Sequence, residues 1–162
     1  MSVQLLLKFL EVSLAAGVGV LSYIITKRYD NNSSIKKTAR IMNYDIIRAV
    51  NILADSKEDN SIPRYNLTSL IDWREQFSII CNSLGIEEAW LIFEFYARLE
   101  HLGTIRNDIF IHPEPILNDD KQKEVYTLSL NKVETKFFEC LQDVLDLGEM
   151  KKVINRLEEM GK

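Results

Sequence analysis

An uncharged apolar run near the start of the chain is the feature that most constrains its fold. Residues 12–26 contain no charged side chain. A helix of this run would be about 22 Å long, and one extended upstream to residue 3 about 36 Å, against about 30 Å for the hydrocarbon core of a bilayer. Lys8 and Glu11 interrupt the longer segment three residues apart, where they can pair on one helical face. The segment therefore predicts one membrane-spanning helix.

The charges that flank this run predict its orientation. Lys8 and the amino terminus lie upstream of the run, whereas several basic residues follow Thr26. The positive-inside rule then places the N-terminus outside the cell and everything after Thr26 in the cytoplasm. We predict a transmembrane anchor over residues 1–29 and a cytoplasmic domain over residues 30–162, attached to the cell membrane by a single pass.

Two other interpretations of the run stay open. A cleaved signal peptide needs positive charge before the apolar run and a small-residue cleavage site after it, but this run ends in Tyr-Ile-Ile-Thr-Lys-Arg. A buried helix of a soluble domain is compatible with the charges at Lys8 and Glu11. A retained anchor accounts for the run and for its flanking charges together.

The charge distribution suggests what the segment after the run contacts. Residues 27–48 carry a net charge of +4, and the rest of the domain carries the negative charge that brings the chain to −4. Basic residues beside a membrane attract anionic lipids by about 1 kcal/mol each, whereas an acidic body disfavours wrapping nucleic acid. The predicted lipid-binding residues are Lys27, Arg28, Lys36, Lys37, Arg40 and Arg48.

Small residues within the run suggest self-association. They recur at a spacing of four, which brings them onto shared faces of a helix and lets two helices approach closely in lipid. We therefore predict a homo-oligomer formed through the anchor. The predicted helix-association residues are Ser13, Ala15, Gly17 and Gly19.

Cysteine and histidine usage predicts no cofactor. Cys81 and Cys140 lie in apolar helical surroundings without a CxxC pair, and they are expected to be reduced, buried small hydrophobes. His101 and His112 have no companions at metal-ligand spacing. We expect no metal site and no cofactor.

The apolar periodicity predicts a mainly α domain with a small β-hairpin. A polar break at Asn31–Ser34 is expected to separate the anchor from the first helix of the domain, and Gly103 is expected to stop the third helix. The alternation in VYTLSL predicts the second strand of the hairpin. The predicted helices cover 35–54, 67–80, 86–102, 133–144 and 150–160, and the predicted strands cover 109–111 and 125–130.

The order of these elements from residue 66 to residue 147 resembles a winged helix-turn-helix domain. The resemblance is carried by the turn Leu84-Gly85-Ile86, the helix end ARLEHLGTI at 97–105 and the second wing strand KEVYTLSL at 123–130. It implies a winged-helix-like fold, whose common use is to read DNA. The resemblance covers about half of the chain.

The residues at the expected DNA-facing positions do not suit DNA. A reading helix presents basic and amide side chains to bases and phosphates, whereas this segment offers carboxylates and apolar groups. We therefore predict that the scaffold contacts a partner protein and no nucleic acid. The predicted partner-contact residues are Glu87, Glu88, Trp90, Leu91 and Glu94.

One short motif raises a catalytic alternative. Arg106 and His112, with Asn107 beside the arginine, match the Arg-x₄₋₆-His signature of HEPN ribonucleases. In those enzymes the motif lies on a helix, whereas Ile109–Ile111 is β-prone here and Pro113 disfavours helix at His112. No nucleophile triad, phosphate loop or pair of catalytic carboxylates is present. We predict no catalytic residue and no enzyme activity.

These observations predict a non-enzymatic, membrane-anchored interaction or effector protein. Its cytoplasmic domain would dock a partner protein and anionic lipid. The layout of residues 1–48 is similar to membrane effector subunits of prokaryotic immune systems, such as those that accompany short Argonautes, which implies antiviral defence by membrane perturbation. The alternatives are a membrane-tethered winged-helix transcription regulator and a HEPN-type ribonuclease.

Overall fold

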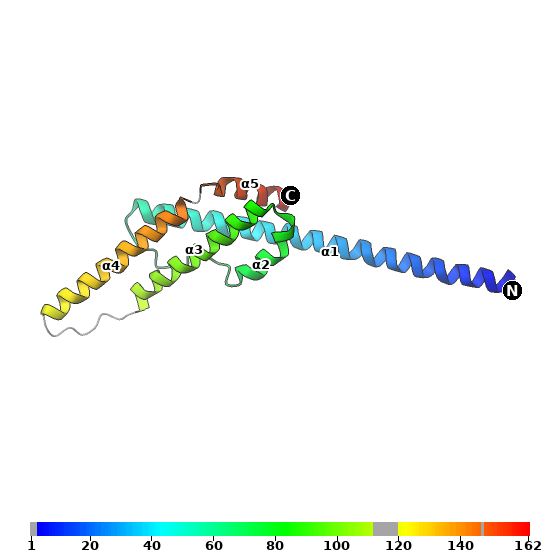
Figure 1. Cartoon of the computed structure of the whole chain (residues 1–162), viewed down its shortest axis with the longest axis horizontal. Helices are drawn as coiled ribbons and strands as arrows, with labels where there is room; N and C mark the ends of the chain where they lie inside the picture. Colours follow the sequence, from blue (N-terminus) through cyan, green and yellow to red (C-terminus); the bar gives the residue numbers. More distant parts are fainter. Residues whose placement is uncertain (1–2, 112–119, 147) are drawn as a thin grey trace.

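The computed structural model describes residues 3–111, 120–146 and 148–162, and the side chains of residues 21–110, 122–146 and 148–162. All regular structure in these residues is helical (Figure 1). The elements are α1 (Val3–Glu58), α2 (Trp73–Ile80), a 3₁₀ turn (Cys81–Ser83), α3 (Ile86–Ile111), α4 (Asp120–Leu145) and α5 (Met150–Gly161).

The long helix α1 has two parts with different surroundings. Residues 21–34, here called distal α1, are exposed throughout and project from the rest of the molecule (Figure 1). Residues 35–58, here called proximal α1, pack against α5, α2 and α4. Proximal α1 and the elements that follow it form the body of the protein.

The predicted break at Asn31–Ser34 is wrong, because α1 continues through it without interruption. Asparagine and serine lower helix propensity by only about half a kcal/mol each relative to alanine. Since helix formation is cooperative, a short polar stretch flanked by helix on both sides stays helical. The predicted boundary between residues 29 and 30 therefore falls inside one helix.

The predicted fold class, mainly α with a small β-hairpin and one transmembrane helix, is wrong. The described residues form an all-α protein. Among the residues described, no helix is long and apolar enough to cross a membrane. The side chains of residues 1–20, which include most of the predicted anchor and Ser13, Ala15, Gly17 and Gly19, lie outside the described residues.

The predicted hairpin, and with it the winged-helix assignment, is also wrong. Residues 109–111 form the last turn of α3, and residues 125–130 lie within α4. Gly103 does not end α3, and it adopts no positive φ of the kind that terminates helices. Thr127 shows how a β-prone residue is accommodated, because its hydroxyl donates to the Lys123 carbonyl 2.9 Å away, one turn earlier.

The core of the body forms where the apolar stripes of the helices meet. Proximal α1 contributes Ala39, Met42, Ile46, Ala49 and Leu53, which are fully buried at the expected spacing of three and four. Helix α3 packs against α4 and α5. The prediction of a last helix after Gly148 is confirmed by α5. The other fully buried residues of the core are Ile80, Ile92, Phe95, Leu102, Phe137, Leu141, Val153 and Leu157.

Candidate interaction surfaces

Distal α1 exposes an apolar surface that the body does not cover. Leu21, Tyr23, Ile25 and Tyr29 are 60–73 % exposed, and Ile24 is 42 % exposed. A single helix with bare apolar side chains is unfavourable in water, because helical stability in proteins comes mainly from packing. We therefore expect a binding partner to cover this surface.

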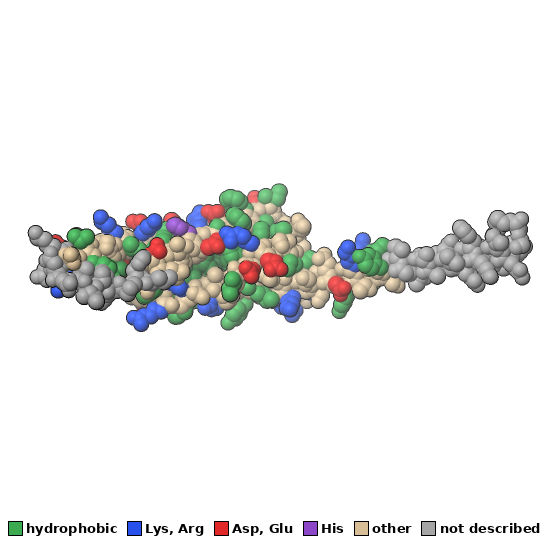
Figure 2. All heavy atoms as spheres, turned by 90° about the horizontal axis from the view of Figure 1, so that it is seen from below, with side chains coloured by type: hydrophobic (Ala, Val, Ile, Leu, Met, Phe, Trp, Pro, Cys, Tyr) green, Lys and Arg blue, Asp and Glu red, His purple; other side chains and the backbone are tan. Residues whose placement is uncertain are grey.

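Two predicted lipid-binding residues lie on the same segment. Lys27 and Arg28 are exposed, and the Lys27 ammonium lies 5.7 Å from the centre of the Tyr23 ring. Figure 2 shows basic and apolar side chains grouped at the base of the projecting part of the chain. Aromatic and basic side chains in this combination are typical of the membrane–water interface.

The structure does not keep the six predicted lipid-binding residues together. Lys36 donates to the Lys162 carbonyl at 3.3 Å, and Arg40 donates through Nε to the Gly161 carbonyl at 2.5 Å. These contacts hold the end of α5 against α1, where the partial negative charge of a helix C-terminus favours cations. Arg48 is half-buried and donates to the Asn66 carbonyl. Lys37 is exposed.

A second uncovered surface lies on α3 beside α2. Trp90 is 61 % exposed and stacks on Phe93, with ring centres 6.4 Å apart. Phe93 contacts Phe77 and the buried Trp73 in turn, so Trp90 is the outer member of a chain of aromatic rings. Exposed tryptophan supported by packed aromatic rings is typical of a protein-binding hot spot. We call Trp90, Phe93 and Ile86 the aromatic face.

The other predicted partner-contact residues already have partners inside the molecule. Glu88 accepts from the Gly85 amide at 2.9 Å and lies 3.8 Å from Arg156 of α5. Glu94 pairs with Arg98 at 2.8 Å. Glu87 is exposed and lies 3.7 Å from Lys152, and Leu91 is half-buried against the core. Of this set, Glu87 and Trp90 are exposed, and Trp90 is the exposed apolar member.

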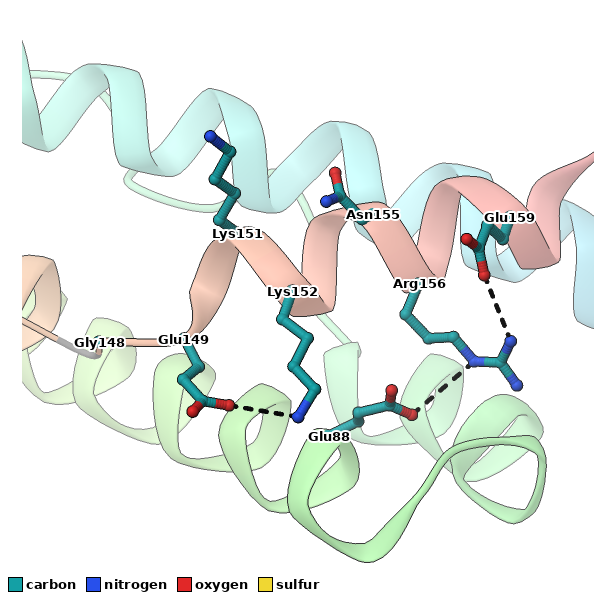
Figure 3. Close-up of a pocket in the computed structure, with 8 residues that line it drawn as sticks. All are labelled: Glu88, Gly148, Glu149, Lys151, Lys152, Asn155, Arg156 and Glu159. Atoms are coloured by element: carbon teal, nitrogen blue, oxygen red, sulfur yellow. Dashed lines mark hydrogen bonds and ion pairs between the residues drawn. The ribbon is translucent and has the colours of Figure 1, made fainter.

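A charged groove of about 500 Å³ separates α5 from the start of α3 (Figure 3). Arg156 lies between Glu88 and Glu159, and Lys152 bonds Glu149 at 3.4 Å. That hydrogen bond is the main reason why the pKa of Lys152 is raised. Because most of these charges neutralise one another, the groove joins α5 to α3 through ion pairs and presents no poised acid or base.

A buried polar centre fastens the segment before α2 to α1. Asp45 is fully buried and accepts hydrogen bonds from Thr68, Ser69 and Tyr96, with the Thr68 hydroxyl at 2.6 Å and the Ser69 amide at 2.7 Å. Burial, and secondly the nearby Asp45 charge, raise the pKa of Tyr96 well above its usual range. No sequence motif marks this centre, because its members are brought together from three separate segments.

The residues that suggested enzymatic or metal chemistry are dispersed. Arg106 and Asn107 lie on α3, beyond the end predicted for that helix at Gly103, and His112 lies outside the described residues. Within the described part of the chain, no group of histidine, cysteine and acidic residues could hold a metal ion. Cys81 and Cys140 are free thiols, and both are half-buried, so they are less buried than predicted.

Comparison of the chain with protein-family models, with curated proteins and with solved structures finds no match.

Proposed function

We propose that this protein is a non-enzymatic docking protein that attaches to membranes through distal α1 and binds a partner protein through its body. The observation that carries this proposal is the exposed apolar surface of distal α1 directly beside Lys27 and Arg28. Apolar burial supplies binding energy, and the basic pair adds attraction to anionic headgroups.

A bilayer suits distal α1 better than a second copy of the chain does. Leu21, Ile24 and Ile25 share one side of the helix, within an arc of about 100°, and Tyr23 lies on the opposite side. A helix–helix contact would cover one stripe and leave the opposite side wet. A membrane interface can cover the three aliphatic side chains and also accommodate the Tyr23 ring at the level of the headgroups.

A vesicle assay tests this attachment. The full chain is diluted from detergent into vesicles of phosphatidylcholine, with or without phosphatidylglycerol, and bound protein is separated by flotation. We expect K27E/R28E to lower affinity for the anionic vesicles at least about tenfold, since each basic residue contributes about 1 kcal/mol and reversal adds repulsion. We expect I24E/I25E to abolish binding to both kinds of vesicle.

The matched control is K132E/K136E on α4, which makes the same change of charge at exposed positions of the body. It should bind like the unchanged chain. Equal loss in the control, or unchanged binding by K27E/R28E, would contradict the proposal. Sedimentation of I24E/I25E as a smaller species than the parent chain, with vesicle binding intact, would assign distal α1 to a second copy instead.

The aromatic face is the proposed site for the partner protein. Glu87 and Glu94 lie three residues before and four residues after Trp90, so both flank it along α3. This arrangement fits a partner that inserts an apolar side chain beside Trp90 and offers a basic side chain to Glu87, whose side chain is 84 % exposed, while Glu94 stays paired with Arg98. We propose the antiviral effector role as a consequence of docking this partner, and self-association through Ser13, Ala15, Gly17 and Gly19 as a separate property of the segment before distal α1.

Site-specific photo-crosslinking in cells tests the aromatic face. A photoreactive residue at position 90 should give one discrete adduct with another protein, and the same residue at Lys132 of α4 should not. Adding Glu87→Lys should weaken the adduct, because charge complementarity is lost. An adduct with a second copy of this chain, or none at position 90, would contradict the assignment.

A further inference from the structure

A cavity of about 280 Å³ lies between the segment Asn66–Trp73 and the second half of α3. Leu70, Trp73 and Leu99 line one part of it, and Thr104, Arg106 and Asn107 line another. We call it the α3 cavity. It joins apolar walls to a few polar groups, as small-molecule sites do.

Arg106 is the buried charged residue that lines the α3 cavity, and no carboxylate of the described residues forms an ion pair with it. Its side chain is only 9 % exposed. It donates to the Tyr65 carbonyl, to Asn66 Oδ1 at 3.3 Å and to Asn107 Oδ1 at 2.7 Å, all of which are neutral acceptors. Its Nε is buried and has no hydrogen-bond partner. A guanidinium always carries its charge, so burial without a counter-charge is unfavourable.

A second guanidinium, that of Arg48, bonds to the same stretch of chain at Asn66. Arg48 of proximal α1 donates through Nη2 to the Asn66 carbonyl at 3.2 Å, and its buried Nη1 has no partner. Trp73 Nε1 is a third buried donor without an acceptor. Buried donors without acceptors are rare in folded proteins. The described residues contain four buried, unpartnered side-chain atoms, and three of them, in Arg48, Trp73 and Arg106, lie in or beside the segment 66–73.

Two carboxylates at or beside the α3 cavity are already engaged. Asp45 accepts from Thr68, Ser69 and Tyr96, as described above. Glu100 lines the cavity but forms a two-pronged ion pair with Arg74, at 2.7 and 3.1 Å. The hydrogen bond from Arg74 is the main reason why the pKa of Glu100 is lowered. The positive charge of Arg106 is therefore left for an external anion.

We propose that the α3 cavity binds a small organic anion, with its phosphate or carboxylate on Arg106 and its apolar part against Leu70 and Trp73. On binding, the guanidinium exchanges its neutral acceptors at Asn66 and Asn107 for oxyanion oxygens. Charge-assisted, two-pronged bonds of this kind are stronger than bonds to neutral amides. The cavity volume limits the ligand to a compact molecule.

The fluorescence of Trp73 gives a direct readout. The chain contains two tryptophans, so Trp90→Phe leaves Trp73 as the single emitter beside the α3 cavity. We use this variant of the full chain and titrate it with phenyl phosphate, benzoate and inorganic phosphate, and with benzyl alcohol as the neutral probe. We expect saturable changes in emission with phenyl phosphate or benzoate, weaker binding of inorganic phosphate, and none of benzyl alcohol.

Two variants test the site itself. Arg106→Gln should weaken binding of the organic anion at least tenfold. Gly103→Leu should abolish binding with Arg106 intact, because Gly103 lines the α3 cavity and a Cβ there meets no heavy atom within 4 Å. If Arg106→Gln does not fold, Gly103→Leu decides the matter. The matched control K151Q/K152Q removes cations from the groove of Figure 3 and should bind normally.

The relative affinities identify the ligand. Tighter binding of phenyl phosphate assigns a phosphate ester, and tighter binding of benzoate assigns a carboxylate. Unchanged binding in Gly103→Leu, loss of binding in K151Q/K152Q alone, or equal binding of benzyl alcohol would overturn the proposal.

Discussion

The two parts of α1 have the same secondary structure and opposite surroundings. In proximal α1, Ile46 and Leu53 are fully buried, whereas Leu21 and Ile25 of distal α1 are 60 and 66 % exposed. The apolar residues of proximal α1 recur on one stripe that other helices cover, whereas Leu21, Ile24 and Ile25 of distal α1 share a side that the body leaves uncovered. Periodicity alone therefore does not show what covers a helix. A stripe buried by other helices belongs to the folded body, and an uncovered apolar side next to basic residues suits a membrane surface.

The largest expected effect is on the buried stripe. Ile46→Ala should lower the free energy of unfolding by about 2–5 kcal/mol, because it removes a fully buried side chain and leaves a cavity. Ile25→Ala, the matched change in distal α1, should change it by less than about 0.5 kcal/mol. Urea unfolding followed by circular dichroism measures both. Equal losses would mean that the two parts of α1 share one covered environment.

The same comparison applies to acidic residues. Asp45→Asn should cost about 2–3 kcal/mol, because a buried carboxylate with several donors becomes an amide with one fewer acceptor and two new hydrogen atoms. Asp30→Asn, at an exposed position of distal α1, is the control and should be close to neutral. Urea unfolding at neutral pH measures both. A neutral Asp45→Asn would show that the segment 66–72 does not depend on this carboxylate.

Alkaline pH provides a smaller test of the same buried centre. Because the pKa of Tyr96 is raised in the folded state, folding keeps this phenol protonated while the unfolded chain ionises near pH 10. Its contribution is complete below pH 10 and falls by about 1.4 kcal/mol by pH 11. Urea midpoints from pH 8 to 11 measure this loss. Tyr96→Phe should reduce the loss of unfolding free energy between pH 10 and 11 by that amount. An unchanged pH dependence would show that Tyr96 does not cause the loss.

The smallest expected effect on stability is at the aromatic face, which is the uncovered apolar surface of the body. Trp90→Ala should cost less than about 1 kcal/mol, because most of the side chain is already in water. Trp73→Ala should cost about 3–5 kcal/mol, because Trp73 is only 3 % exposed and stacks on Tyr96. Thermal unfolding compares the two. A large loss for Trp90→Ala would assign Trp90 to the core and remove it from the proposed docking site.

The sequence predicted the helices with one clear stripe and failed where two periods overlap. The stripe of proximal α1 and the helix after Gly148 were both found. The run VYTLSL alternates like a strand, but Tyr126, Leu130 and Val133 also recur at helical spacing, and Tyr126 and Val133 line a small cavity beside Ile109 of α3. Short alternation does not distinguish the two periods, and tertiary packing selects the helix.

The candidate sites were predicted only where a single segment carries the signal. Lys27, Arg28 and Trp90 are exposed, and local sequence drew attention to each. The pairing of Arg40 with the end of α5, and the convergence of Arg48 and Arg106 on Asn66, join segments that are far apart in the chain. No local pattern encodes such contacts, so they require the fold.

The unbroken course of α1 has a consequence for the spacing of charge. No glycine or proline interrupts residues 20–58, so the helix acts as a stiff spacer. It rises about 18 Å from Lys27 to Ala39, the first fully buried apolar residue. The Debye length at physiological ionic strength is about 8 Å. If Lys27 lies at an anionic membrane surface, the acidic body is held roughly two Debye lengths away, so salt largely screens the repulsion between the two. A shorter spacer would bring the body close enough for the membrane to repel it.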